Sequence, residues 1–184
     1  MTKAAFEGLE PYDGKLSCTV LKGERGRETP DLPGVDLNLN FPYIIDTNPN
    51  PPEKETDAIM NLCQQRHFVL SADFHAGAEF AIYPWGRIRD HIADESWYVL
   101  TCKQWADLAH ENSPAGYFDD FGGYSNYNKT NGSITPPLGT FIDYVQYFQQ
   151  CRDIKAEISS IKILSPAQLI PHWNYQKASF LAYL

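Results

Sequence analysis

Two short segments alternate between apolar and polar residues, which is the pattern of a β-strand with one face turned toward a core. The first covers residues 67–75 ("HFVLSADFH") and the second covers residues 153–159 ("DIKAEIS"). His75 lies on the polar face of the first segment, and Lys155 and Glu157 lie on the polar face of the second. The alternation therefore predicts two half-buried strands whose polar faces carry side chains suited to chemistry.

Apolar residues recur at helical spacing in three other segments, which are residues 48–67, 94–112 and 171–184. Along the chain the predicted order is helix, strand, helix, strand and helix. This alternation predicts an α/β layered fold. The length of the chain predicts one domain that covers residues 1–184.

Two stretches show neither pattern. Residues 1–33 are dominated by Gly, Pro and charge, and within them residues 16–21 ("LSCTVL") predict at most a short edge strand. Residues 113–141 are rich in Gly, Asn, Tyr and Pro, and so long an irregular stretch inside a domain is typical of a functional loop. Asn38 and Asn40 are residue types that form turns by bonding to their own backbone.

The composition indicates a globular, acidic protein. Apolar residues make up 43% of the chain, aromatic residues make up 14%, and the net charge is −8. This charge argues against nucleic acid or an anionic membrane as the main partner, because both need a basic surface. No apolar run is long enough to cross a bilayer. The four cysteines are far apart and form no Cys-x-x-Cys pair, so a zinc knuckle and a dense disulfide framework are not expected.

His75 stands at the end of its predicted strand, where α/β folds often place ligand-binding or catalytic groups. A histidine in that position is also commonly a structural, hydrogen-bonded residue. Glu157 suits either a catalytic base or one partner of an ion pair with Lys155. Asp73 shares the face of His75, so it can orient the imidazole ring or bind a loop amide. From the residues alone, we therefore predict an acidic α/β domain with a His/Glu site.

Six segments between Gly34 and the C-terminus follow one another in a distinctive order: "GVDLNLNFP", "PEKETDAIM", "FVLSADFHAGAEFAIYPWG", "TNGSITPPLGTFIDY", "AEIS" and "HWNYQKASFLAYL". This order resembles that of the zinc carboxypeptidases of the M14 family, in particular the carboxypeptidase E/M/D-type and related bacterial branch. The resemblance implies a three-layer α/β/α fold with a central mixed β-sheet, incomplete at the N-terminus. Residues 1–184 would then be the C-terminal portion of the family fold, with a zinc ion at the strand ends.

The resemblance also implies roles for individual positions. In this family a zinc ion and a glutamate activate water, while an arginine, an Asn-Arg pair and a tyrosine hold the substrate. The matching residues here are His75 as the third zinc ligand, Glu157 as the general base, Arg27 as the oxyanion arginine with Arg25 as its competitor, Asn38 in the carboxylate clamp, Thr135 at the position of the tyrosine and Ile142 at the floor of the side-chain pocket. An aliphatic floor would favour apolar C-terminal side chains over basic ones.

Several departures from the family pattern bear on activity. Leu39 stands where the clamp arginine belongs, and the loss of a charge-assisted pair should cost about 2–5 kcal/mol in substrate recognition. Thr135 lacks the reach and the ring of the tyrosine, and Lys155 replaces a small uncharged residue. No His-x-x-Glu precedes Asn38, because the first histidine is His67. Two of the three zinc ligands implied by the resemblance are therefore absent from this sequence.

The resemblance predicts a metallocarboxypeptidase-type hydrolase that removes C-terminal residues from peptides with a zinc-activated water, impaired or inactive in this chain. Two alternatives stay open, namely a non-catalytic carboxypeptidase-like binding domain and an M14 relative that acts on peptidoglycan peptides. The chain would be either a fragment or a degenerate relative. Zinc is the implied cofactor, a peptide or protein C-terminus is the implied partner, and a secreted or periplasmic location is the implied setting.

Overall fold

Four strands form a mixed β-sheet in the order β1-β4-β2-β3. The structure is a computed structural model that describes residues 35–86, 91–119, 124–125 and 139–184. The strands are β1 (Leu70–His75), β2 (Ala78–Tyr83), β3 (Tyr124–Ser125) and β4 (Arg152–Ser159). β4 pairs in parallel with β1 and antiparallel with β2, while β3 pairs in parallel with β2. The predicted mixed sheet is confirmed.

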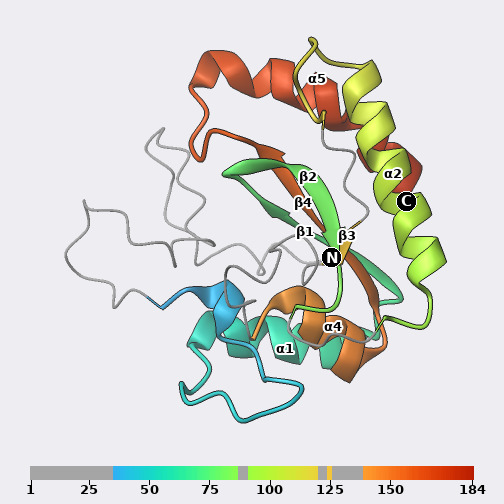
Figure 1. Cartoon of the computed structure of the whole chain (residues 1–184). Coiled ribbons are helices and arrows are strands. Elements are labelled where there is room, and N and C mark those ends of the chain that lie inside the picture. Colours follow the sequence, from blue (N-terminus) through green and yellow to red (C-terminus); the bar gives the residue numbers. More distant parts are fainter. Residues whose placement is uncertain (1–34, 87–90, 120–123, 126–138) are drawn as a thin grey trace, which may run out of the picture.

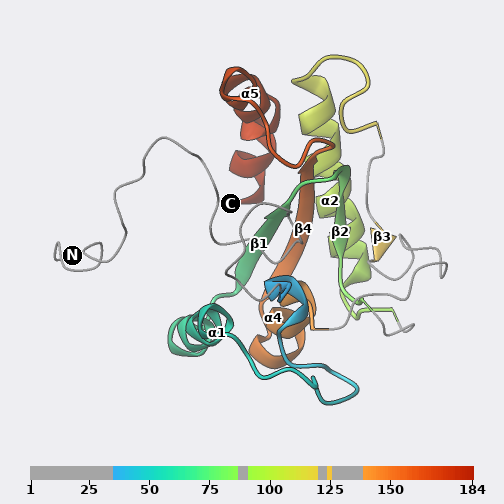
Figure 2. The same cartoon turned by 90° about the vertical axis from the view of Figure 1, so that its left-hand side faces the viewer.

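Helices cover both faces of this sheet. They are the short 3-10 helix η3 (Leu37–Leu39), α1 (Lys54–Arg66), α2 (Glu95–Glu111), α4 (Phe141–Gln149) and α5 (Pro166–Tyr183). α2 and α5 pack together on one side of the sheet, and α1 and α4 lie on the other side (Figures 1 and 2). The three-layer α/β/α arrangement expected from the sequence is therefore confirmed.

The predicted elements differ from the observed ones mainly at their ends. The strand predicted over residues 67–75 begins at Leu70, and the strand predicted over residues 153–159 begins one residue earlier, at Arg152. The helix predicted over residues 171–184 is wrong at its start, because α5 begins at Pro166 and contains Pro171 within it. A capping box formed by the residues just before and inside its first turn fixes this earlier start. The edge strand predicted over residues 16–21 lies outside the described residues.

The apolar side of the sheet packs against α2 and α5. Ile154 and Ala156 of β4 are fully buried there, and Phe74 of β1 contacts the rings of Trp105 and Phe180. Each of these sheet residues occupies an apolar position of the alternating pattern. The contact removes large aromatic and aliphatic surfaces from water, which is the main favourable term in folding. It leaves the opposite, polar face of β1 and β4 turned toward α4.

Polar groups inside the α2–α5 layer are paired with one another. The Trp105 indole donates to Gln176 Oε1 at 2.8 Å, and the Gln176 amide donates to the Tyr117 hydroxyl at 2.6 Å. Tyr117 in turn donates to the carbonyl of Ile158 at 2.7 Å. Because buried polar groups are costly when unpaired, this chain of bonds fixes the helices on the sheet in one arrangement. It holds the end of β4, and therefore Glu157, in place.

Asn40 anchors the start of α1 from a distance. Its Oδ1 accepts hydrogen bonds from the Glu53 backbone N–H at 2.7 Å and from the Thr56 hydroxyl at 2.8 Å. Its Nδ2 donates to the Pro51 carbonyl at 3.1 Å. The side chain is buried and serves as a long-range cap for a helix whose first N–H groups have no partner within the helix. Asn40 does end the local turn η3, where its backbone N–H donates to the Leu37 carbonyl at 3.2 Å, but its side chain bonds to distant residues and not to its own backbone.

Candidate functional site

His75 and Glu157 lie side by side on neighbouring strands. β1 and β4 are parallel, and residue 75 is in register with residue 157. Paired residues of adjacent parallel strands direct their side chains to the same face of the sheet. The imidazole and the carboxylate are both half-buried and lie near the carboxyl ends of their strands. The structure therefore brings together the two residues on which the predicted site depends.

The helix η3 brings Asn38 to the same place. The Asp36 carboxylate accepts the Asn38 backbone N–H at 3.0 Å and so stabilises this turn. The Asn38 side-chain nitrogen lies 3.1 Å from His75 Nε2, and its side-chain oxygen accepts the Phe141 backbone N–H at 3.0 Å. Asn38 thus links His75 to the N-terminus of α4. No signal in the sequence pattern pointed to this link between residues that are far apart in the chain.

Leu39 follows Asn38 on η3 and presents a neutral side chain. It is 38% exposed, and so belongs to the partly open surface beside Asn38. The next residue, Asn40, is turned inward to cap α1. An isobutyl group offers no donor to a carboxylate, whereas the guanidinium expected at this position offers a fork of N–H groups. The turn η3 is therefore apolar at the position where the family pattern has a charge.

The same face of β1 and β4 carries further polar and charged residues, which precede His75 and Glu157 along the two strands. In-register pairs place Ser71 beside Asp153 and Asp73 beside Lys155. The Ser71 hydroxyl donates to Asp153 Oδ1. Burial raises the pKa of Asp153 well above its ordinary range, and the negative charge of Asp73 raises it further. The alternating pattern already put Asp153 on this face, but it could not show that the face is covered by α4.

Asp73 lies two residues before His75 on β1, so the two side chains are neighbours on the same face of the sheet. Its Oδ2 is 3.3 Å from His75 Nε2. Both carboxylate oxygens are buried and accept no hydrogen bond from any residue that the structure describes. A buried carboxylate oxygen without a hydrogen-bond donor is unfavourable, so Asp73 can accept a hydrogen bond from a donor placed beside it. The sequence-based suggestion that Asp73 orients the ring of His75 stays a prediction.

Asp143 fastens the loop that follows β2 to the first turn of α4. Its two carboxylate oxygens accept the Gly86 backbone N–H at 3.0 and 3.1 Å, and its own N–H is capped by Thr140. Burial raises the pKa of Asp143 to about 6, although the Gly86 bond and the charge of Lys155 act to lower it. Lys155 is itself buried and also lowers the pKa of Asp153. Lys155 therefore supplies a buried positive charge beside these carboxylates.

The remaining predicted residues divide into two groups. Ile142 is fully buried in the first turn of α4, and its role at the floor of a side-chain pocket stays a prediction. Arg27, its competitor Arg25, and Thr135 lie outside the described residues, so their placement is untested. Within the ranges that the structure describes, the candidate site therefore consists of His75, Glu157, Asn38 and the buried charges behind them.

These residues do not fit a zinc ion by themselves. A catalytic zinc site needs three protein ligands that converge on the metal. Across residues 35–86, 91–119 and 139–184, no three His, Cys, Asp or Glu side chains are grouped so that they could hold a metal ion. His75 faces an amide and a buried carboxylate instead of further imidazoles. The described part of the chain thus supplies one candidate ligand and no complete ligand set.

The structure is an α/β/α domain that places His75 and Glu157 side by side on β1 and β4. The family model of the zinc carboxypeptidases, Peptidase M14, matches residues 17–179. The chain belongs to the M14 zinc carboxypeptidase family. This confirms the resemblance found in the six ordered segments.

Individual relatives agree with this assignment. Carboxypeptidase M of Mus musculus is 28% identical over 193 residues, which cover 100% of this chain and 42% of that protein. Carboxypeptidase D of Drosophila melanogaster is 31% identical over 187 residues, which cover 91% of this chain and 13% of that protein. The chain thus spans less than half the length of these curated relatives.

A solved structure shows the same fold. The carboxypeptidase A from Helicoverpa armigera superposes with a TM-score of 0.57 at 17% sequence identity, over 80% of this chain and 39% of that one. At this identity the similarity concerns the fold alone. No helix among the residues described here is both long and apolar enough to cross a membrane.

Proposed function

We propose that this chain carries part of a carboxypeptidase-type hydrolase site, with Glu157 as its general base and His75 as one of its metal ligands. The observation that supports it most strongly is the in-register pairing of His75 with Glu157 on parallel strands. A base and a metal-binding imidazole on one face of a sheet can act on the same water molecule and the same scissile bond. Family membership makes the C-terminus of a peptide or protein the expected substrate.

We propose further that these 184 residues alone hydrolyse such substrates poorly or not at all. The described residues contain no complete set of metal ligands, and Leu39 offers no charge to a substrate carboxylate. A non-catalytic binding domain of the same fold is the second candidate function. The partly exposed, apolar Leu39, next to Asn38 on η3, favours it, because an apolar side chain suits binding better than recognition of a charged C-terminus.

The direct test is hydrolysis of an N-blocked dipeptide by the purified chain, with and without added zinc. We expect no zinc-dependent release of the C-terminal residue above the buffer rate, and no difference between the natural chain and Glu157→Gln. Turnover that depends on zinc and disappears in Glu157→Gln would show that the chain holds a complete site. The proposal of impaired activity would then be wrong.

A second experiment measures peptide binding and so tests the site even when the chain hydrolyses no substrate. Leu39→Arg should restore a bidentate donor, so a peptide with a free C-terminus should bind roughly tenfold or more tightly, while the same peptide with an amidated C-terminus should not. Leu39→Met is the matched control, since it changes shape without adding charge. If Leu39→Arg failed to distinguish the acid from the amide in calorimetric titrations, peptide C-termini would not bind beside Asn38.

A further inference from the structure

Two buried cysteines meet where α1 packs against α4. Cys63 belongs to the second half of α1, and Cys151 stands between the end of α4 and the start of β4. Both are free thiols in the structure. They pack in one cluster of buried side chains, whose other members are Phe41, Tyr144 and Val145. The fold therefore brings together two thiols that are far apart in the sequence.

The two thiols are also close enough to act on each other electrostatically. Burial raises the pKa of the Cys63 thiol, and Cys151 raises it further. Burial raises the pKa of the Cys151 thiol as well. Cys102, in contrast, is buried in the separate cluster between the sheet and the helices α2 and α5. Among the described residues, Cys63 and Cys151 are thus the pair of cysteines that share one cluster.

The surroundings of Cys151 can accommodate the loss of its thiol hydrogen. Cys151 Sγ donates a hydrogen bond to Ser71 Oγ, and the two atoms are 3.3 Å apart. The Ser71 hydroxyl in turn donates to Asp153 Oδ1. When Cys151 loses its hydrogen, Ser71 keeps the bond that it donates. Oxidation of this sulfur therefore leaves no buried donor without a partner.

We propose that Cys63 and Cys151 form a disulfide bond when the chain folds in an oxidising environment, and that this bond ties α1 to the start of β4. The oxidant is a small disulfide such as oxidised glutathione. One cysteine thiolate attacks it and releases the first glutathione thiolate, and the other cysteine then displaces the second from the mixed disulfide. The pair loses two electrons and two protons, and both are recovered in two molecules of reduced glutathione.

Burial of both sulfurs decides when the bond can form and how long it lasts. Thiol–disulfide exchange needs a thiolate and access for the reagent, so the pair should react while the chain folds and slowly afterwards. Once formed, the bond closes a long loop and restricts the unfolded chain, which stabilises the folded one. The proposal involves neither His75 nor a metal ion, so it can fail or succeed independently of the proposed function.

The test refolds the reduced and denatured chain in a buffer of reduced and oxidised glutathione. The remaining free thiols are then alkylated in urea, and the digested chain is mapped by mass spectrometry. We expect the peptides that contain Cys63 and Cys151 to be joined, and Cys102 to be alkylated. Because the bond closes a long loop, the oxidised chain should unfold at a temperature about 10 °C higher than the reduced chain.

Cys63→Ala and Cys102→Ala are the matched variants, since each removes one buried thiol. Cys63→Ala should lose both the joined peptides and the difference in unfolding temperature, whereas Cys102→Ala should keep both. A loss of that temperature difference in Cys102→Ala, or its persistence in Cys63→Ala, would contradict the proposal.

A second measurement compares the ratio of disulfide to dithiol in the same glutathione buffer with and without urea. Native packing should raise this ratio about a hundredfold or more, because a bond that stabilises the folded chain is itself stabilised by folding. An equal ratio in the two buffers would overturn the proposal. So would alkylation of both Cys63 and Cys151 after refolding, or a bond from either of them to Cys18 or Cys102.

Discussion

Replacing Lys155 by methionine is expected to lower the free energy of unfolding by about 3–5 kcal/mol near neutral pH. Lys155 is buried, is in register with Asp73, and acts electrostatically on Asp143 and Asp153. Methionine fills a similar volume but leaves these carboxylates without a buried positive charge, and uncompensated buried charge is strongly unfavourable. The measurement is urea denaturation at pH 7, followed by circular dichroism.

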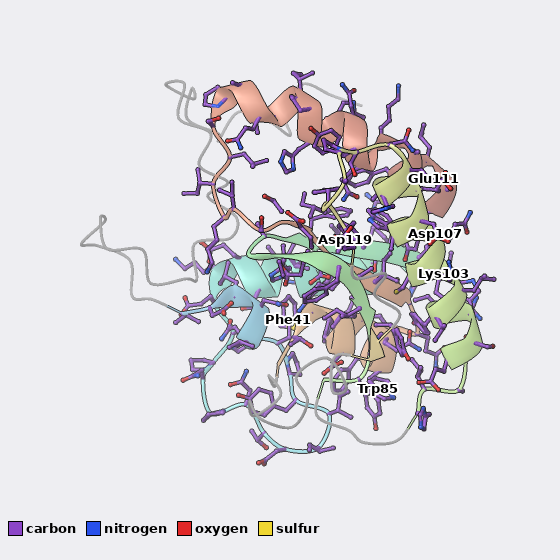
Figure 3. The ribbon with its side chains drawn as sticks, turned by 45° about the horizontal axis from the view of Figure 1, so that its top comes forward. Phe41, Trp85, Lys103, Asp107, Glu111 and Asp119 are labelled. Atoms are coloured by element: carbon purple, nitrogen blue, oxygen red, sulfur yellow. The ribbon has the colours of Figure 1, made fainter. Side chains whose placement is uncertain are left out.

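Lys103→Met is the matched control for this variant. Lys103 pairs with Asp107 at 2.5 Å along the outer side of α2, where both side chains are about half exposed (Figure 3). Exposed pairs of this kind contribute about 0–1 kcal/mol, so the control should change stability little. The loss of stability caused by Lys155→Met should also become smaller at acid pH, because the buried carboxylates are then protonated and need no positive charge beside them. Equal effects of the two substitutions would contradict a stabilising role for the buried charge.

Asp143→Asn is expected to stabilise the chain by about 3 kcal/mol at pH 7 and by almost nothing below about pH 4. Burial raises the pKa of Asp143 from 3.8 to about 6. Between these values the folded chain binds the proton and the unfolded chain does not. The contribution of Asp143 to stability is therefore fully present below about pH 4 and is lost as the pH rises through about 6. Asparagine resembles the protonated form and keeps an oxygen for the Gly86 N–H.

The measurement is the free energy of unfolding of the natural chain and of Asp143→Asn at each pH from 4 to 8. The difference between the two values gives the effect of the ionised Asp143 carboxylate on stability. Asp107→Asn is the control, since Asp107 is exposed on α2. Its free energy of unfolding should differ from that of the natural chain by nearly the same small amount at every pH. An Asp143→Asn chain that became less stable than the natural chain as the pH rose would show that the ionised carboxylate stabilises the fold. The raised pKa of Asp143 would then be wrong.

The faces of β1 and β4 could be predicted from the sequence, and their pairing could not. Alternation places His75 on the polar side of one strand and Glu157 on the polar side of another. It does not say that the two strands are neighbours, because residues from distant parts of the chain meet through packing on α2 and α5. The order of six family-like segments supplied that information indirectly, by implying the fold.

The contacts among the buried charged residues could not be predicted from the sequence either. Lys155 was recognised as unusual at its position, yet nothing in the sequence showed that α4 covers it or that Asp143 and Asp153 lie near it. Asn38 and Asn40 do lie in a local turn, η3, as the sequence predicts. Their side chains, however, make long-range bonds, to His75 and to the start of α1, and the local pattern does not predict these partners.

The most direct test of the central claim is a zinc titration of the purified 184-residue chain, by calorimetry and by metal analysis after dialysis. His75→Ala and the surface variant His91→Ala serve as the paired comparison. We predict no saturable one-to-one binding in any of the three proteins, because the described residues present His75 without two further ligands. One zinc ion bound per chain, lost in His75→Ala and kept in His91→Ala, would contradict this account.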